Sequence, residues 1–141
     1  MPTPSPKAVI AISPTSTTNG ATTTGSFDTL GYDFAVIDVM ATTSNDTTNN
    51  FSVLTLSEGD TTSTYTAVST GDTDFTIPAA DTANNSVVAQ FRVDLRGRKR
   101  YLKLSCSPVT TQTIWAQAQL LRGDETPVAA GTAGVDVLVE T

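Results

Sequence analysis

The chain has 141 residues, a net charge of −6 and 38% hydrophobic residues, which fits one globular domain. It contains one cysteine and no histidine, which excludes an internal disulfide, a Cys/His zinc site and every catalytic arrangement that needs a histidine. Threonine makes up 27 of the 141 residues. Because β-branched side chains favour strands over helices, this composition predicts an all-β protein.

The first six residues include three prolines, Pro2, Pro4 and Pro6, and cannot form a regular strand. We expect residues 1–6 to form an extended arm that reaches a neighbouring subunit, or else a frayed terminus without a partner. The apolar run at 8–12 is shorter than the roughly 7 to 15 residues of a secretion signal. No apolar stretch approaches the roughly 18 residues of a membrane span. We therefore expect neither export by the general route nor a transmembrane helix.

Alternation of apolar and polar residues predicts eight to ten short strands. Residues 34–40 are apolar except for Asp38, which predicts a central strand covered on both faces. The segment at 87–95 alternates most cleanly, with its odd-numbered residues apolar. In chain order, the predicted strands are 7–13, 21–29, 34–40, 51–57, 65–68, 73–77, 87–95, 101–106, 114–120 and 135–139.

Turn residues separate these predicted strands. Glu58-Gly59-Asp60 and Thr70-Gly71-Asp72 predict hairpins, and the polar stretches 41–50 and 78–85 predict loops. Many short strands at regular spacing, with turns between them, are typical of a sandwich of two sheets. The sequence therefore predicts a single β-sandwich domain over residues 7–141, jelly-roll-like in its topology.

Few residues offer catalytic or metal-binding chemistry. Acidic turn residues such as Glu58 and Asp60 have the spacing of ordinary turns, which select Asp for backbone reasons, although calcium binding stays open. Asp38 and Asp94 lie on predicted strands and could serve a β-sandwich glycosidase or lyase, or else pair with Arg92 or its neighbours. We expect no enzymatic activity, no cofactor and no metal site.

Two single side chains have distinct expected roles. Cys106 lies on the apolar face of a predicted strand with Leu102 and Leu104, and we expect it to be buried and inert. Trp115 alternates out of phase with its apolar neighbours and shares a face with Gln117. It is either the second layer of a buried strand or an exposed aromatic anchor at a subunit interface.

Positive charge is concentrated in one segment. Of eight Lys and Arg residues, six lie between Arg92 and Lys103, whereas the acidic residues are spread along the chain. This asymmetry predicts contact with an acidic protein surface, including that of an identical subunit, although a solvated hairpin is the alternative. The net charge of −6 and the 6% aromatic content argue against nucleic acid as the partner. The predicted contact residues in this turn are Arg96, Arg98, Lys99 and Arg100.

Three segments resemble the small head decoration, or cement, proteins of tailed bacteriophages. They are residues 31–40 (GYDFAVIDVM), 93–104 (VDLRGRKRYLKL) and 115–122 (WAQAQLLR), so the resemblance spans roughly residues 30–122. It implies a sandwich subunit, often trimeric, that clamps major capsid proteins on the outside of the virion. It also implies that the basic turn and Tyr101 contact the capsid or a sister subunit.

These expectations describe a protein made in the host cytoplasm that binds the major capsid protein and itself, but neither nucleic acid nor membrane. Repeated contacts of a trimer with several capsid subunits would supply avidity. The competing interpretation is a carbohydrate- or surface-binding β-sandwich module of a phage tail or fibre. Such modules stack sugars on several exposed aromatic side chains, and aromatic residues are scarce here.

Overall fold

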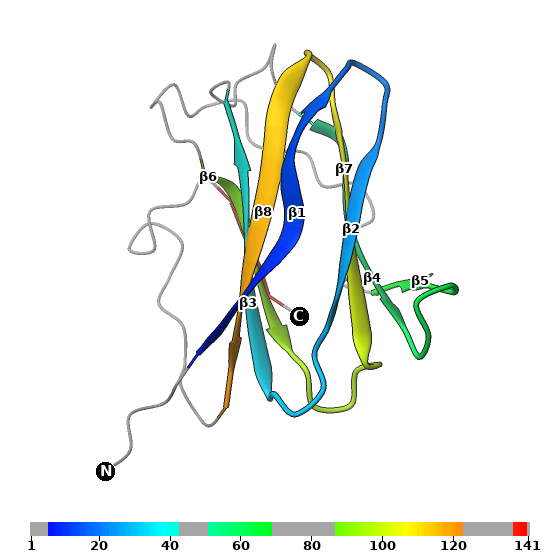
Figure 1. The fold of residues 1–141 in the computed structure, drawn as a ribbon, viewed down its shortest axis with the longest axis vertical. Coiled ribbons are helices and arrows are strands. Elements are labelled where there is room, and N and C mark those ends of the chain that lie inside the picture. Colours follow the sequence, from blue (N-terminus) through cyan, green and yellow to red (C-terminus); the bar gives the residue numbers. More distant parts are fainter. Residues whose placement is uncertain (1–5, 43–50, 69–86, 123–136, 141) are drawn as a thin grey trace.

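The computed structural model describes residues 6–42, 51–68, 87–122 and 137–140, and every regular element in them is a β-strand. Figure 1 shows the strands stacked in two layers. The strands are β1 (Lys7–Thr17), β2 (Thr23–Asp28), β3 (Phe34–Ala41), β4 (Phe51–Gly59), β5 (Thr66–Ala67), β6 (Val87–Asp94), β7 (Tyr101–Pro108), β8 (Gln112–Leu121) and β9 (Val137–Glu140). Within these ranges, no helix long and apolar enough to cross a membrane is found.

The strand order is that of a jelly roll. One sheet has the order β1-β8-β3-β6-β9 and the other the order β2-β7-β4-β5. The first eight strands therefore form the two four-stranded layers of that fold, and β9 extends the first layer by pairing parallel to β6. The sequence-based prediction of an all-β, jelly-roll-like sandwich is confirmed, and the nine strands of the described ranges fall within the predicted eight to ten.

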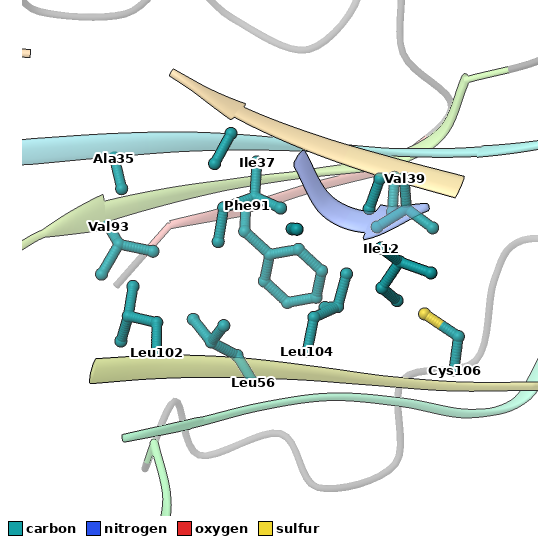
Figure 2. Packing of buried hydrophobic residues seen from close by; sticks show 14 of the residues in the cluster. Ile12, Ala35, Ile37, Val39, Leu56, Phe91, Val93, Leu102, Leu104 and Cys106 are labelled. Atoms are coloured by element: carbon teal, nitrogen blue, oxygen red, sulfur yellow. The ribbon is translucent and has the colours of Figure 1, made fainter. Parts of the chain in front are cut away.

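The core lies between the two sheets and is built largely by alternate residues of strands such as β3 and β7, as Figure 2 shows. On β3, the inward residues are Ala35, Ile37 and Val39, each at most 1% exposed. On β7, they include Leu104 and Cys106, both fully buried. Burial also raises the pKa of the Cys106 thiol to about 12, so the thiolate is disfavoured. The expectation that Cys106 is buried is confirmed, and its inertness stays a prediction.

Most predicted strands are present within a few residues of their expected bounds. β1, β4 and β7 extend further than the alternation suggested, and only Thr66–Ala67 of the predicted strand 65–68 is paired. The predicted strand 73–77, the predicted loop 78–85 and residues 1–5 of the predicted arm lie outside the described residues. The assignment of 7–141 to one domain stays a prediction.

Two local expectations are wrong, and a third is correct only in part. The outer side chains of β3 are only half-buried, so this central strand is fully covered on one face alone. The hairpin predicted at Glu58 is present between β4 and β5, but Glu58 and Gly59 end β4 and the turn follows them. The basic segment is not a hairpin, because β6 and β7 belong to different sheets and residues 95–100 cross between them. Local alternation identifies strands but cannot tell which sheet a strand joins.

The two sheets meet closely at the edge formed by β1 and β2. A bulge in β1 breaks its register with β8 between Ile10 and Ile12, and both Ala11 and Ile12 are buried. A methyl group at Gly25 of β2 would lie 1.7 Å from the backbone oxygen of Ala11. Position 25 therefore has no room for any side chain.

We predict that Gly25→Ala destabilises the fold by more than about 2 kcal/mol, because the backbone of β1 must move to admit the methyl group. Chemical denaturation measures the change. Ser26→Ala, at an exposed position on the same strand, is the control and should change stability by less than about 0.5 kcal/mol. Equal stability of the two variants would contradict the close approach of β1 and β2.

Candidate functional site

Two tight turns lie together at the lower end of the sandwich in Figure 1. Residues 29–32 connect β2 to β3, and residues 95–98 begin the connection from β6 to β7. In each turn the last amide donates to the first carbonyl, over 3.2 Å and 3.1 Å respectively. The third residues, Gly31 and Gly97, have φ values of 89° and 83°. These features define type II turns, which need the left-handed region that glycine adopts without strain.

Hydrogen bonds tie the two turns to each other. The backbone carbonyl of Arg100 accepts two hydrogen bonds from Thr29, one from its amide at 3.0 Å and one from its Oγ1 at 2.6 Å. The amide of Leu95 donates to the carbonyl of Asp33 over 2.8 Å. Because Thr29 is only 5% exposed, these bonds are shielded from water. Residues 95–100, the loop of the basic segment between Arg92 and Lys103, are therefore fixed by buried hydrogen bonds.

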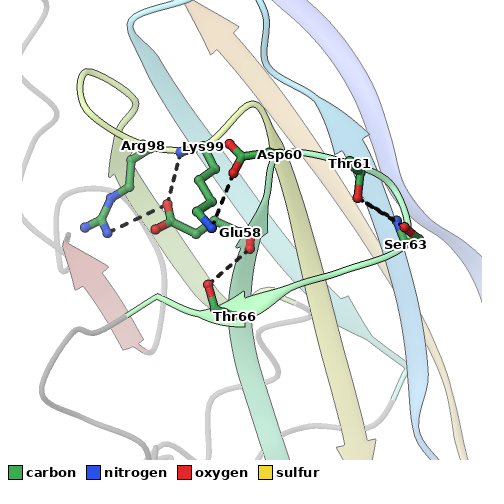
Figure 3. A network of polar contacts seen from close by, with 7 residues as sticks. All are labelled: Glu58, Asp60, Thr61, Ser63, Thr66, Arg98 and Lys99. Carbon is green, nitrogen blue, oxygen red and sulfur yellow. Dashed lines mark hydrogen bonds and ion pairs between the residues drawn. The ribbon is translucent and has the colours of Figure 1, made fainter.

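Glu58, at the end of β4 in the four-stranded sheet, also binds the loop at 95–100, as Figure 3 shows. Its Oε2 accepts a hydrogen bond from the amide of Lys99 at 3.3 Å and lies 4.0 Å from Nη1 of Arg98. The ammonium group of Lys99 lies 3.4 Å from the carboxylate of Asp60. Two basic side chains of the loop thus have acidic partners from β4 and the residue after it.

Two further arginines form forked pairs with aspartates. Arg100 donates to both carboxylate oxygens of Asp28, at 3.0 and 2.7 Å. Arg96 does the same with Asp94, at 2.9 and 2.8 Å, and its amide adds a third hydrogen bond at 3.0 Å. The fork fixes each guanidinium in one orientation. Acidic residues of the same chain therefore pair with most of the cations of the basic segment.

The cations at this end also cover aromatic rings. The guanidinium of Arg96 lies 5.1 Å from the ring centroid of Phe34, and that of Arg100 lies 4.9 Å from Tyr101. The Lys103 ammonium lies 5.2 Å from the ring of a tyrosine in the loop after β4. These distances permit cation–π attraction, which further restricts the long side chains.

We call this surface the basic end. It comprises Lys7, residues 28–34, 58–65 and 95–103, and Arg122. Seven of the eight Lys and Arg residues of the chain lie here, together with four Asp and Glu residues. On a chain of net charge −6, the basic end is therefore the positively charged pole.

The fold brings together five of the six predicted contact residues. Arg96, Arg98, Lys99, Arg100 and Tyr101 all belong to the basic end. Whether they contact a partner is not tested by their internal pairs and stays a prediction.

Trp115, the sixth predicted contact residue, lies elsewhere. It is half-buried on the outer face of the five-stranded sheet, where it pairs with Met40 of β3. It is six residues from the end of β8, or about 20 Å along the strand. Trp115 therefore cannot join the basic end in one small contact.

The carboxylates considered for catalysis do not form a pair. Asp38 lies opposite Gln90 and accepts a hydrogen bond from its amide at 2.8 Å, whereas Asp94 lies four residues further along β6. That offset is about 13 Å, beyond the roughly 5 to 9.5 Å that separates glycosidase carboxylates. Among the described residues, no group of three or more His, Cys, Asp and Glu side chains gathers as a metal site would require.

Sequence reasoning missed several members of the basic end. Arg122 joins it from the end of β8, where its Nε donates to the carbonyl of Gly31 at 2.8 Å and its guanidinium covers the ring of Tyr32. Leu30, at the tip of the first turn, is 66% exposed. The Leu30-Gly31 pair was the available signal, because a leucine before a turn glycine occupies the second position of a type II turn.

Comparisons with known proteins assign no family. No family model matches the chain, and no curated protein matches it. A solved structure of a family GH115 4-O-methyl-α-glucuronidase, BtGH115A, with specificity for decorated arabinogalactans, is similar with a TM-score of 0.43 and 13% identity. The match covers 84% of this chain and 16% of that enzyme's chain. A match this distant supplies no argument about activity.

We predict that the two forked aspartates titrate well below the other carboxyl groups. The hydrogen bond from Arg100 is the largest cause that lowers the pKa of Asp28 from 3.8 to about 2. The hydrogen bonds from Arg96 lower the pKa of Asp94 to about 2 in the same way. Because the folded-state pKa is lowered, the stabilisation is complete above about pH 4 and is lost as the pH falls through 2.

Carbon-13 NMR titration of the side-chain carboxyl groups tests this prediction. Arg100→Gln should return the pKa of Asp28 toward 3.8 and leave that of Asp94 near 2, which serves as the internal control. An Asp28 that already titrates near pH 4 in the unaltered protein would show that the fork does not persist in solution.

We also predict that Thr29→Val loosens the basic end. The change removes the hydroxyl donor to Arg100 while keeping the side-chain shape, and should cost about 1 kcal/mol. It should also speed hydrogen exchange at the Lys99 amide, measured by NMR. Thr24→Val, at an exposed position on β2, is the control. Unchanged exchange at Lys99 would mean that Thr29 does not hold the loop.

Proposed function

We propose that this chain is a structural protein that decorates the outside of a tailed-bacteriophage capsid and stabilises the lattice of the major capsid protein. The proposed role is non-catalytic, and the proposed location is the virion exterior after synthesis in the host cytoplasm. The resemblance of residues 31–40, 93–104 and 115–122 to cement proteins motivates the proposal. The jelly-roll topology is compatible with it.

The observation that carries the proposal is the rigidity of the basic end. Thr29 and Asp33 join its two turns, and Glu58 binds the amide of Lys99. The forked pairs orient Arg96 and Arg100 before any partner arrives. A preorganised surface loses less conformational entropy on binding than a flexible one. Arginine and tyrosine, which gather here, are the residues that most often dominate protein–protein contacts.

We propose further that the chain assembles as a homotrimer. A trimer would place three copies of the basic end against several capsid subunits, so that modest individual contacts combine into stable decoration. The acidic character of the rest of the chain also makes contact between one subunit's basic end and a sister subunit compatible with its charge.

A carbohydrate-binding module of a phage tail or fibre is the second candidate. Sugar stacking needs free aromatic faces. Here the rings of Tyr32, Tyr65 and Tyr101 lie under cationic groups within 5.2 Å of their centroids. These contacts favour protein binding over sugar binding at this end of the sandwich.

Binding to undecorated capsids tests the proposed function. The capsids are assembled from the major capsid protein of a tailed phage whose genome encodes this chain, and the chain is added over a series of salt concentrations. We expect a particle of about three times 14.7 kDa in light scattering, binding that weakens as salt rises, and decorated capsids that resist heat better. Capsids already saturated with the protein are the control and should bind no more.

A monomer that fails to bind these capsids at every salt concentration would contradict the proposal. Binding to a glycan array under the same conditions would then favour the tail or fibre module.

A further inference from the structure

Leu30 is an exposed apolar side chain on a fixed backbone. It occupies the second position of the turn at 29–32, and its amide donates to Oδ1 of Asp28 at 3.0 Å. The side chain is 66% exposed, whereas its neighbours Phe27 and Thr29 are buried. The sandwich core is therefore complete without Leu30. A leucine displayed on a rigid tip is suited to entering an apolar recess on another surface.

Two stacked arginines belong to the same turn and its anchor. Arg122 donates to the carbonyl of Gly31. Its guanidinium carbon lies 5.1 Å from the ring centroid of Tyr32. Arg100 covers Tyr101 and is forked to the aspartate that caps the Leu30 amide. Leu30 therefore has one arginine bonded to the residue after it and another bonded to the aspartate that accepts from its amide. An apolar centre with a polar, charged rim is the usual anatomy of a protein contact.

We propose that Leu30, with Arg100 and Arg122, forms the docking surface for the partner, which presents an apolar recess bordered by carboxylates. This inference rests on the proposed function, in which the partner is the major capsid protein. The positive character of the basic end selects an acidic partner, because opposite charges steer encounter and like charges oppose it. The docking surface is thus centred on the β2–β3 turn, which the charge pattern of the sequence did not indicate.

Asp28 acts as an internal competitor in this arrangement. Its two oxygens hold Arg100 at 3.0 and 2.7 Å in the free protein. A partner carboxylate that approaches Arg100 must share or replace those hydrogen bonds. Neutralising Asp28 should therefore favour docking, whereas neutralising Arg100 should weaken it. A pair that served only the fold would give no such opposite effects on binding.

The experiment measures the affinity of four single variants for undecorated capsids, after thermal denaturation and light scattering show that each keeps its fold and oligomeric state. Leu30→Ala should weaken binding about tenfold or more. Ile10→Ala is the matched control, since Ile10 is 67% exposed on the outer face of the five-stranded sheet, and should bind normally. Arg100→Gln should weaken binding and Asp28→Asn should strengthen it. Asparagine keeps the oxygen that accepts from the Leu30 amide.

The outcomes separate this inference from the proposed function. If the unaltered protein binds capsids and Leu30→Ala binds equally well, the docking surface is wrong while the decoration role stands. If Asp28→Asn and Arg100→Gln change affinity in the same direction, the acidic rim is wrong. Loss of the trimer in Leu30→Ala would assign the tip to a sister subunit and overturn the inference. If the unaltered protein binds no capsid, both proposals fail.

Discussion

Apolar packing between the two sheets is the interaction on which the rest of the structure depends. The chain changes sheet at every connection between consecutive strands except β4–β5 and β8–β9, so neither sheet is built from one continuous segment. Each sheet can therefore form only as its residues meet those of the other across the core. This packing also places the connections β2–β3 and β6–β7, which form much of the basic end.

Hydrogen bonds fix the loops of the basic end in one conformation. Crossing loops are usually the most mobile parts of a sandwich, yet here one carbonyl, that of Arg100, accepts two hydrogen bonds from Thr29. Glu58 reaches the same loop from β4. The exposed ion pairs contribute little to stability in water, so their main effect is to set the directions of the side chains. A rigid display of arginine and leucine would lose less conformational entropy in the proposed contact than a flexible one.

The sequence was sufficient for the strands and insufficient for what joins them. Period-two alternation located β3, β6, β7 and β8 because each buries one face in the shared core. It could not place β6 and β7 in different sheets, since sheet membership depends on contacts between distant segments. The partners Asp28 and Glu58 were hidden for the same reason, as Asp28 lies 72 residues from Arg100 and Glu58 lies 41 residues from Lys99 in the sequence. The positive cluster could be predicted, whereas its pairing with these distant acidic residues could not.

The most direct test of the account is a cryo-electron microscopy map of the decorated capsid, at a resolution that places individual strands. We predict that residues 29–32 and 95–100 face the capsid surface, with Leu30 enclosed by the major capsid protein. A map in which the protein binds through the outer face of the five-stranded sheet, with the basic end directed to solvent, would contradict it.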